Sequence, residues 1–234
     1  MIRLYSEESF SKNKKIELAK EELKYFRQVR RGEGSAELFN RTGQTARGRV
    51  VDSSFLIEEV LQSKTPQYEV DLAVGLPDTK VLKPLVRVTS ELGVRSLFFF
   101  VADRSQAGRK RLEIVESLDR IAIEAARQCE RAKPLEIKTL EFGSVLEKLS
   151  THQIILFDED PGVSGGVELK RLFSADKPVL CLVGPEGGWT STERQHLDDA
   201  GVQKLHLPTP ILKVESAAAA AALLCIVYKA GMLK

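Results

Sequence analysis

Residues 179–190, VLCLVGPEGGWT, carry an apolar strand directly into a loop that contains three glycines, a proline and a carboxylate. The following residues 190–193, TSTE, form a capping box that predicts the start of a helix. Glycines at such a turn let the backbone approach a ligand closely and leave N–H groups free to bind it. A tight strand-to-helix turn without a ligand is the alternative. A phosphate loop is excluded because the G-x-x-x-x-G-K-[ST] spacing is absent and Glu186 would repel phosphate.

A second unusual loop follows at residues 207–216, LPTPILKVES. Pro208 and Pro210 hold this loop extended, since proline fixes its own φ angle. Six alanines at residues 217–222 come next, in a stretch that predicts a helix. An alanine-rich helix lets another backbone come close because only methyl groups intervene. The helix packs on a sheet, and a threaded chain segment or a second subunit is the additional neighbour that this composition allows.

Strands and helices alternate from Gly75 onward. The expected helices cover residues 79–92, 110–129, 143–149, 191–200 and 216–229, and the expected strands cover residues 97–102, 154–157, 179–183 and 204–207. Continuously apolar strands between helices predict a parallel sheet that is covered on both faces. Ligands of such sheets gather at the carboxyl ends of the strands, which is where both unusual loops begin.

The first 75 residues instead predict short strands, at residues 36–39, 48–51, 55–61 and 68–74, separated by turn-forming segments. This spacing is typical of a small β-barrel or sandwich, and residues 14–26 are expected to form one helical insertion. Gly75 and Pro77 lie where the predicted short strands give way to alternating strands and helices. The expected domains are therefore residues 1–73 and 74–234.

Composition narrows the class of protein. With 43% apolar and 29% charged residues among 234, the chain is not disordered. The net charge is only +2, yet residues 1–50 hold twelve Lys and Arg against seven Asp and Glu, which suggests an anionic partner at this end. The three cysteines and three histidines are scattered, so no metal site is expected. The start lacks the apolar stretch of a signal peptide, and no apolar run is long enough to span a bilayer, so we expect a cytoplasmic protein without a membrane partner.

Both loops resemble motifs of the ribosomal RNA small subunit methyltransferase E family, V-G-P-E-G-G and I-L-(K/R)-x-E-(S/T)-A. Further similar segments are ELGV at 91–94, DRS at 103–105, EAARQCER at 124–131 and ILFDE at 155–159, with a weaker likeness at 25–34. The resemblance implies a PUA-like β-barrel for RNA and a trefoil-knotted α/β SPOUT domain that forms a homodimer. It also implies S-adenosyl-L-methionine as cofactor, N3 of a uridine in 16S ribosomal RNA as target, and the small ribosomal subunit as partner.

The expected cofactor contacts follow from the two loops and the family motifs. They are Leu156, Gly184, Pro185, Glu186, Gly187, Leu207, Ile211, Leu212, Lys213, Ser216 and Ala217. The expected catalytic residues are Arg104, Glu186 and Glu215, with both glutamates lining the pocket and Arg104 facing the nucleotide together with Arg131. Glu215 has an alternative role, since a carboxylate there favours the N-terminus of the following helix. Arg131 is equally well explained as a solvated helix end.

The expected RNA contacts are basic residues that grip phosphates: Arg3, Lys12, Lys14, Lys15, Arg27, Arg30, Arg31, Arg47, Arg49 and Arg131. For each of them alone, a solvated surface charge is the alternative.

The chain departs from the family pattern at several positions. Pro208 replaces a glycine, Pro210 and Lys213 replace arginines, Ser216 replaces threonine, and Tyr25 stands where histidine is common. Lysine lacks the planar fork of arginine, and proline supplies no side-chain donor. Two rival functions therefore stay open: the same chemistry on another rRNA or tRNA nucleotide, and a non-catalytic RNA-binding relative. A dinucleotide dehydrogenase is excluded because no G-x-G-x-x-G follows a strand.

Overall fold

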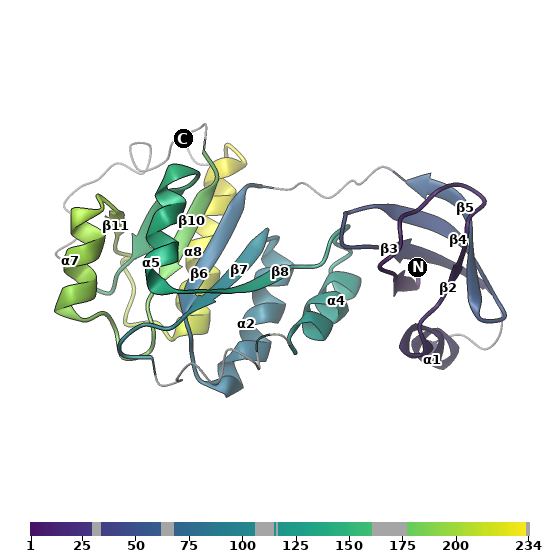
Figure 1. Ribbon diagram of the computed structural model, residues 1–234, viewed down its shortest axis with the longest axis horizontal. Coiled ribbons are helices and arrows are strands. Elements are labelled where there is room, and N and C mark those ends of the chain that lie inside the picture. Colours follow the sequence, from purple (N-terminus) through teal and green to yellow (C-terminus); the bar gives the residue numbers. More distant parts are fainter. Residues whose placement is uncertain (30–33, 62–67, 106–114, 116, 161–176, 233–234) are drawn as a thin grey trace. The chain divides into compact units, whose positions relative to one another are not determined.

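The computed structural model describes residues 1–29, 34–61, 68–105, 115, 117–160 and 177–232. The chain divides into two compact units (Figure 1). The first contains residues 1–66 and 123–134, and the second contains residues 67–122 and 135–234.

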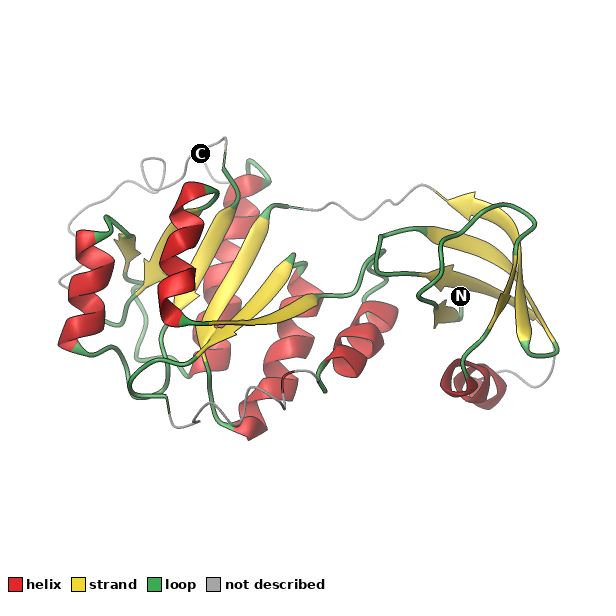
Figure 2. Cartoon of the chain, in the orientation of Figure 1, coloured by secondary structure: helices red, strands yellow, loops and turns green. Residues whose placement is uncertain are grey.

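The first unit is built on a curled mixed sheet of five strands with the order β1-β3-β4-β5-β2 (Figure 2). The elements are β1 (Arg3–Tyr5), β2 (Lys15–Glu17), α1 (Lys20–Val29), β3 (Gly34–Phe39), β4 (Thr45–Val51) and β5 (Ser54–Leu61). Strand β1 pairs in parallel with β3, and the other pairs are antiparallel. Residues alternate between buried and exposed along β4, as expected for a sheet with one face on the core. Phe26 of α1 packs into that core with Phe55 and Ile57.

One helix over residues 14–26 is a wrong prediction. Residues Lys15–Glu17 pair with β5 as strand β2, and the helix begins only at Lys20. Ile16 is buried between two exposed neighbours, which is the two-residue period of a strand. Three residues are too few for this period to be distinguished from a helix by sequence.

A distant segment completes the first unit. Ala126 packs with Tyr5 and Phe39 in a small apolar cluster. The Arg127 guanidinium lies 4.3 Å from the centroid of the Tyr25 ring and 2.6 Å from the Glu22 carboxylate. The first unit is therefore assembled from two separate stretches of chain.

The second unit contains a six-stranded parallel sheet with the order β11-β9-β10-β6-β7-β8. Its strands are β6 (Val70–Gly75), β7 (Ser96–Phe100), β8 (Glu136–Leu140), β9 (Gln153–Phe157), β10 (Val179–Val183) and β11 (Gln203–Leu205). The division expected between residues 73 and 74 falls inside β6. All of β6 belongs to this sheet, because it pairs with β10 on one side and β7 on the other.

Helices cover both faces of this sheet, as the apolar strands predict (Figure 2). These helices are α2 (Thr79–Leu92), α5 (Phe142–Glu147), α7 (Ser191–Asp199) and α8 (Val214–Lys229). Helix α4 (Asp119–Gln128) begins in this unit and continues into the first unit from Ile123. Alternate strand residues enter two separate cores. Phe99 and Cys181 pack with α2 and α8, whereas Phe98 and Leu182 pack with α5 and α7. The alanine-rich α8 packs on this sheet and on α2, so one of its close neighbours is a helix of the same unit. A threaded segment or a second subunit as a further neighbour stays a prediction.

A polar cluster lies at the amino end of the sheet's central strands. Asp71 of β6 is only 2% exposed, and its carboxylate accepts hydrogen bonds from Arg95 at 2.9 and 2.5 Å. The His152 ring Nε2 lies 2.9 Å from the same carboxylate. Burial alone would raise the pKa of Asp71, but the hydrogen bonds and charges of Arg95 and His152 outweigh it and lower the pKa.

Candidate active site

The two unusual loops line one cavity of about 650 Å³ at the carboxyl ends of the strands. Its wall consists of the segments that follow β9, β10 and β11, together with the first turn of α8 and Val81 of α2. Four of the six strands, β6, β7, β9 and β10, are apolar and almost entirely buried, so their ends hold the loops on a rigid base. Residues 184–188 and 207–212 are therefore neighbours in space although other elements separate them in the chain.

The glycines of the first loop are required by packing within the protein. A Cβ atom on Gly184 would lie 2.7 Å from the Trp189 indole nitrogen, and one on Gly187 would lie 2.9 Å from the Arg104 carbonyl oxygen. Trp189 is buried and stacks on Phe100 with ring centroids 5.9 Å apart. At both positions a neighbouring protein group excludes a side chain. That these glycines also let a ligand approach the backbone stays a prediction.

A buried carboxylate joins this loop to the segment that follows β7. Glu193 is 4% exposed, and its carboxylate accepts hydrogen bonds from the backbone N–H groups of Asp103 and Thr190, both at 2.9 Å. The Thr190 hydroxyl accepts from the Glu193 N–H, so the expected capping box is present. Next to it, the Arg104 guanidinium donates to the Gly187 carbonyl at 3.3 Å. Arg104 therefore lies beside the glycine loop, although it is outside the cavity wall.

The charged groups of the cavity are mainly acidic. Asp158, Glu159, Glu186 and Glu215 line it, and Lys213 is the lysine among the lining residues. Asp158 and Glu159 are paired with Arg194 of α7. Burial would lower the pKa of Arg194, but the hydrogen bond that Arg194 donates to Asp158 and the charges of the nearby carboxylates raise it. This leaves the charges of two glutamates facing the cavity.

The first of these glutamates, Glu186, accepts a hydrogen bond from the Asp78 N–H at 3.0 Å. Glu215 lies half-buried in the first turn of α8. Within the described part of the chain, neither forms an ion pair, so the cavity suits a ligand that carries positive charge.

Most of the expected cofactor contacts do line the cavity. These are Gly184, Pro185, Glu186, Gly187, Leu207, Ile211, Leu212, Lys213 and Ala217, and Glu215 lies among them. Two do not. Leu156 is fully buried in the core on the α5 and α7 side, because it alternates with Phe157, which does reach the cavity. Ser216 is exposed and lies one position further around α8, outside the wall.

Several cavity residues are absent from the sequence-based set. Asp158, Glu159 and His206 follow strand ends directly, so the rule that ligands gather at these ends was sufficient to indicate them. The His206 ring Nδ1 lies 3.2 Å from the Asp158 carbonyl. Val81 has no comparable signal, because only the tertiary packing of α2 brings it to the cavity.

The expected RNA contacts of the first unit differ in their surroundings. Arg3 is wrong as an RNA contact: it is 4% exposed and donates to Glu37 at 2.8 Å and to the Ala126 carbonyl at 2.9 Å. It lies on the edge strand β1, where the segment around Ala126 and the Phe39 ring cover its side chain. Arg131 is half-buried and donates to the Lys133 carbonyl at 3.1 Å. Arg30 and Arg31 lie outside the described residues.

The other expected RNA contacts are accessible, but some face carboxylates. Lys14 lies 3.0 Å from Glu8 and Arg49 lies 2.5 Å from Glu58. Arg47 is exposed and opposite Glu59 in the register of β4 and β5. Lys12, Lys15 and Arg27 are exposed as well.

Across the described residues, no group of His, Cys, Asp and Glu side chains is arranged to hold a metal ion. In the same part of the chain, every helix is too short or too polar to cross a membrane.

Comparison with known proteins identifies the family. A family model described as an RNA methyltransferase domain matches residues 63–226. The chain is 33% identical over 163 residues to the ribosomal RNA small subunit methyltransferase E of Aquifex aeolicus, and the match covers 69% of each chain. A relative of the same name from Rickettsia conorii is 25% identical over 226 residues, covering 92% of this chain and 91% of that one.

A solved structure shows the same fold over nearly the whole chain. It is a ribosomal RNA small subunit methyltransferase E from Neisseria gonorrhoeae bound to S-adenosyl methionine, with a TM-score of 0.84 at 20% identity, covering 97% of this chain and 98% of that one. This likeness confirms the expected fold class, a PUA-like barrel followed by a SPOUT domain. From the family match and the sequence identity together, we conclude that the chain belongs to the ribosomal RNA small subunit methyltransferase E family.

Proposed function

We propose that this chain transfers a methyl group from S-adenosyl-L-methionine to N3 of a uridine in 16S ribosomal RNA. The observation that carries the proposal is a cavity that both family loops line, where Glu186 and Glu215 form no ion pair within the described residues. S-adenosyl-L-methionine carries a positively charged sulfonium, so the charge of the cavity supports this cofactor over an anionic one. A relative with the same fold is bound to S-adenosyl methionine.

The residues present fit the cofactor. The backbone of residues 184–188 and 207–212 would hold it, with Leu212 and Val214 offering apolar surface and Glu215 offering charge. When bound, the cofactor supplies an electrophilic methyl group, so the protein mainly has to position the reacting atoms.

The side chains around the cavity have two tasks in this proposal. Uridine N3 must lose a proton, and Glu186 and Glu215 are the carboxylates at the cavity that can accept it. A uracil anion would be stabilised by a nearby cation, and the position of Arg104 beside Gly187 supports this role for it. Arg131, in the first unit, stays a prediction as a nucleotide contact.

The remaining expectations about partners belong to the same proposal. The first unit would bind ribosomal RNA of the small subunit, the second unit would form the homodimer, and the reaction would take place in the cytoplasm. A different target nucleotide is the second candidate, because Pro210 and Lys213, which depart from the family pattern, both line the cavity. That function keeps the cofactor and changes the base.

Methylation of purified small subunits tests the proposed reaction. Subunits from a strain that lacks this activity would be incubated with the protein and cofactor, and their nucleosides analysed by mass spectrometry. We expect 3-methyluridine to appear only when both are present. Another methylated nucleoside would establish the second candidate function, and no new methylated nucleoside would contradict both.

Cofactor binding has its own readout. Trp189 is the single tryptophan of the chain, and it packs directly under Gly184 of the cavity wall. Its fluorescence should therefore change in a saturable way on titration with S-adenosyl-L-methionine. A chain that binds RNA but shows no such change, and gains no thermal stability from the cofactor, would be a non-catalytic relative.

A further inference from the structure

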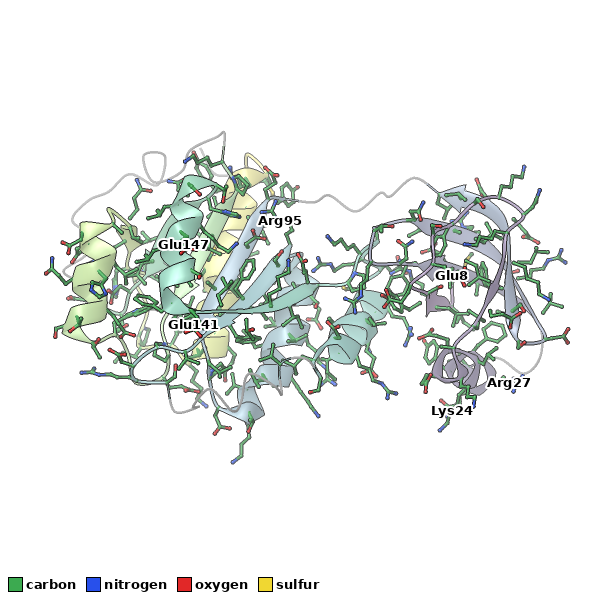
Figure 3. The ribbon with its side chains drawn as sticks, in the orientation of Figure 1. Glu8, Lys24, Arg27, Arg95, Glu141 and Glu147 are labelled. Atoms are coloured by element: carbon green, nitrogen blue, oxygen red, sulfur yellow. The ribbon has the colours of Figure 1, made fainter. Side chains whose placement is uncertain are left out.

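The outer face of α1 carries a row of basic side chains. Lys20, Lys24 and Arg27 are all exposed, and at 100° per residue they lie within about 60° of one another around the helix. The buried residues Glu22 and Phe26 lie on roughly the opposite side of α1, where they hold it against the rest of the unit. Figure 3 shows Lys24 and Arg27 on the side of α1 that points away from the strands.

This basic face is shaped to receive a ligand. Lys20, Lys24 and Arg27 line a shallow hollow of about 380 Å³ together with Leu23 and Gln28. From Lys20 to Arg27 the helix rises about 10 Å, which is long enough to face about three successive phosphates of one nucleic-acid strand. Leu23 and Gln28 add an apolar contact and an amide donor beside the row.

The row also differs electrostatically from the other basic residues of the first unit. Arg41, Arg47 and Arg49 each have a carboxylate next to them: Glu7 lies 3.3 Å from Arg41, Glu58 lies 2.5 Å from Arg49, and Glu59 is opposite Arg47. Among the described residues, no ion pair involves Lys20, Lys24 or Arg27. The one carboxylate next to this row on α1 that is exposed, Glu21, points further round the helix.

From this arrangement we propose that the face formed by Lys20, Lys24 and Arg27 binds the phosphate backbone of the RNA substrate. The inference rests on the proposed function and names the surface that carries its RNA affinity. Lys20 and Lys24 are new to the set of RNA contacts, whereas Arg3, Arg47 and Arg49 leave it, because Glu37, Glu59 and Glu58 already face these arginines. Phosphate contacts of this kind fix the position of the RNA without reading its sequence.

A triple variant tests the proposal. Lys20→Gln, Lys24→Gln and Arg27→Gln together remove three charges from exposed positions, so the fold should stay intact. With a 16S ribosomal RNA transcript as the probe, we expect affinity to fall on the order of tenfold or more near 100 mM salt. The slope of log affinity against log salt should become shallower by about 2 to 3, because fewer counterions are released.

The matched control removes the same charge from the same unit. Arg41→Gln, Arg47→Gln and Arg49→Gln neutralise three arginines that already face carboxylates, so affinity and salt slope should change little. Equal losses in both triples would overturn the proposal, since total charge would then be responsible. A loss for assembled small subunits but not for the transcript would also overturn it, because the face would then contact ribosomal protein.

Failure of this inference can be told apart from failure of the proposed function. Both triples should keep the Trp189 fluorescence response to S-adenosyl-L-methionine, which reports on the second unit. If the unmodified chain methylates small subunits and the α1 triple does so with unchanged RNA affinity, only the inference about α1 is wrong. If the unmodified chain neither binds nor methylates the RNA, the proposed function itself is contradicted.

Discussion

Glu215 belongs to the cavity wall and to the N-terminal turn of a helix at the same time. Its carboxylate lines the cavity, and it also lies in the first turn of α8, where a negative charge interacts favourably with the helix dipole. Both roles predict that the residue is acidic, so the sequence alone cannot separate them. The two roles differ in the group with which the negative charge interacts: the ligand of the cavity in one, and the N-terminus of α8 in the other.

We predict that Glu215→Gln weakens binding of S-adenosyl-L-methionine by about two- to fivefold, the size of a partly exposed ion pair. Binding of the demethylated product S-adenosylhomocysteine should change less, because the product has lost the sulfonium charge. Titrations followed by Trp189 fluorescence measure both affinities. The matched control is Glu21→Gln, which removes a first-turn glutamate from α1 and should leave both affinities unaltered. Should Glu215→Gln only lower the free energy of unfolding, the helix dipole alone explains the residue.

Single residues could be predicted from the sequence where local rules suffice. Glu186, Lys213 and Glu215 were expected at the cavity because the loops that carry them begin at strand ends. Leu156 and Arg3 were misplaced because both lie in strands, where the face that a residue points to depends on register and neighbours. No local pattern marks Val81, whose place depends on how α2 packs.

At the scale of elements, a buried carboxylate at the amino end of the sheet connects three strands through its hydrogen bonds. Asp71 on β6 holds Arg95, which precedes β7, and His152, which precedes β9. Because the pKa of Asp71 is lowered in the folded state, this carboxylate stabilises the fold above the ordinary aspartate pKa of about 4. The stabilisation is lost as the pH falls through the lowered folded-state pKa.

Replacing Asp71 with asparagine should therefore lower the free energy of unfolding by about 3 kcal/mol at pH 7, as expected for removing one partner of a buried pair. The difference from the unmodified chain should shrink as the pH falls below about 4. Urea denaturation across this pH range gives both quantities. Asp198→Asn is the control, since Asp198 is half exposed and pairs with Lys204 at the surface; it should cost less than about 1 kcal/mol. A pH-independent effect of Asp71→Asn would show that the site contributes through packing instead of charge.

Elements were predictable where their pattern was long. Helix α2 and strand β10 have the bounds that the sequence indicates, because a capping Asp78 and a glycine C-cap delimit α2 and an apolar run defines β10. Strand β8 was not anticipated, because an edge strand of polar, partly exposed residues lacks the apolar signal of the central strands. The order of the strands was beyond local pattern altogether, since β10 lies between β9 and β6.

At the scale of the whole molecule, the two units do not correspond to two uninterrupted halves of the chain. Residues 123–134 belong to the first unit, while the sequence around them belongs to the second. The sequence changes from short strands to alternating strands and helices only once, near Gly75, and no change in composition marks residues 123–134 as part of the first unit. The composition therefore indicates that the chain has two parts. Only tertiary contacts show that residues 123–134 belong to the first one.

The discontinuous unit makes a truncation informative. A chain that begins at residue 67 keeps all of β6, so we expect it to bind S-adenosyl-L-methionine within about threefold of the full chain and to lose its RNA affinity. Ala126 and Arg127 lose their partners Tyr5 and Glu22, so the amides of residues 123–134 should exchange hydrogen much faster. Exchange measured by mass spectrometry tests this, with residues 214–229 as the internal reference. Loss of cofactor binding would indicate that the second unit does not fold alone.

Because residues 123–134 belong to the first unit, this unit is completed only late in the synthesis of the chain. A ribosome completes β1 to β5 long before it adds the segment that packs on Tyr5 and Phe39, so the nascent barrel waits with that apolar surface uncovered while β6, α2 and β7 emerge. Slow codons or a bound chaperone ahead of position 134 would lengthen this exposure, whereas such a delay after it would leave the amino-terminal unit already closed.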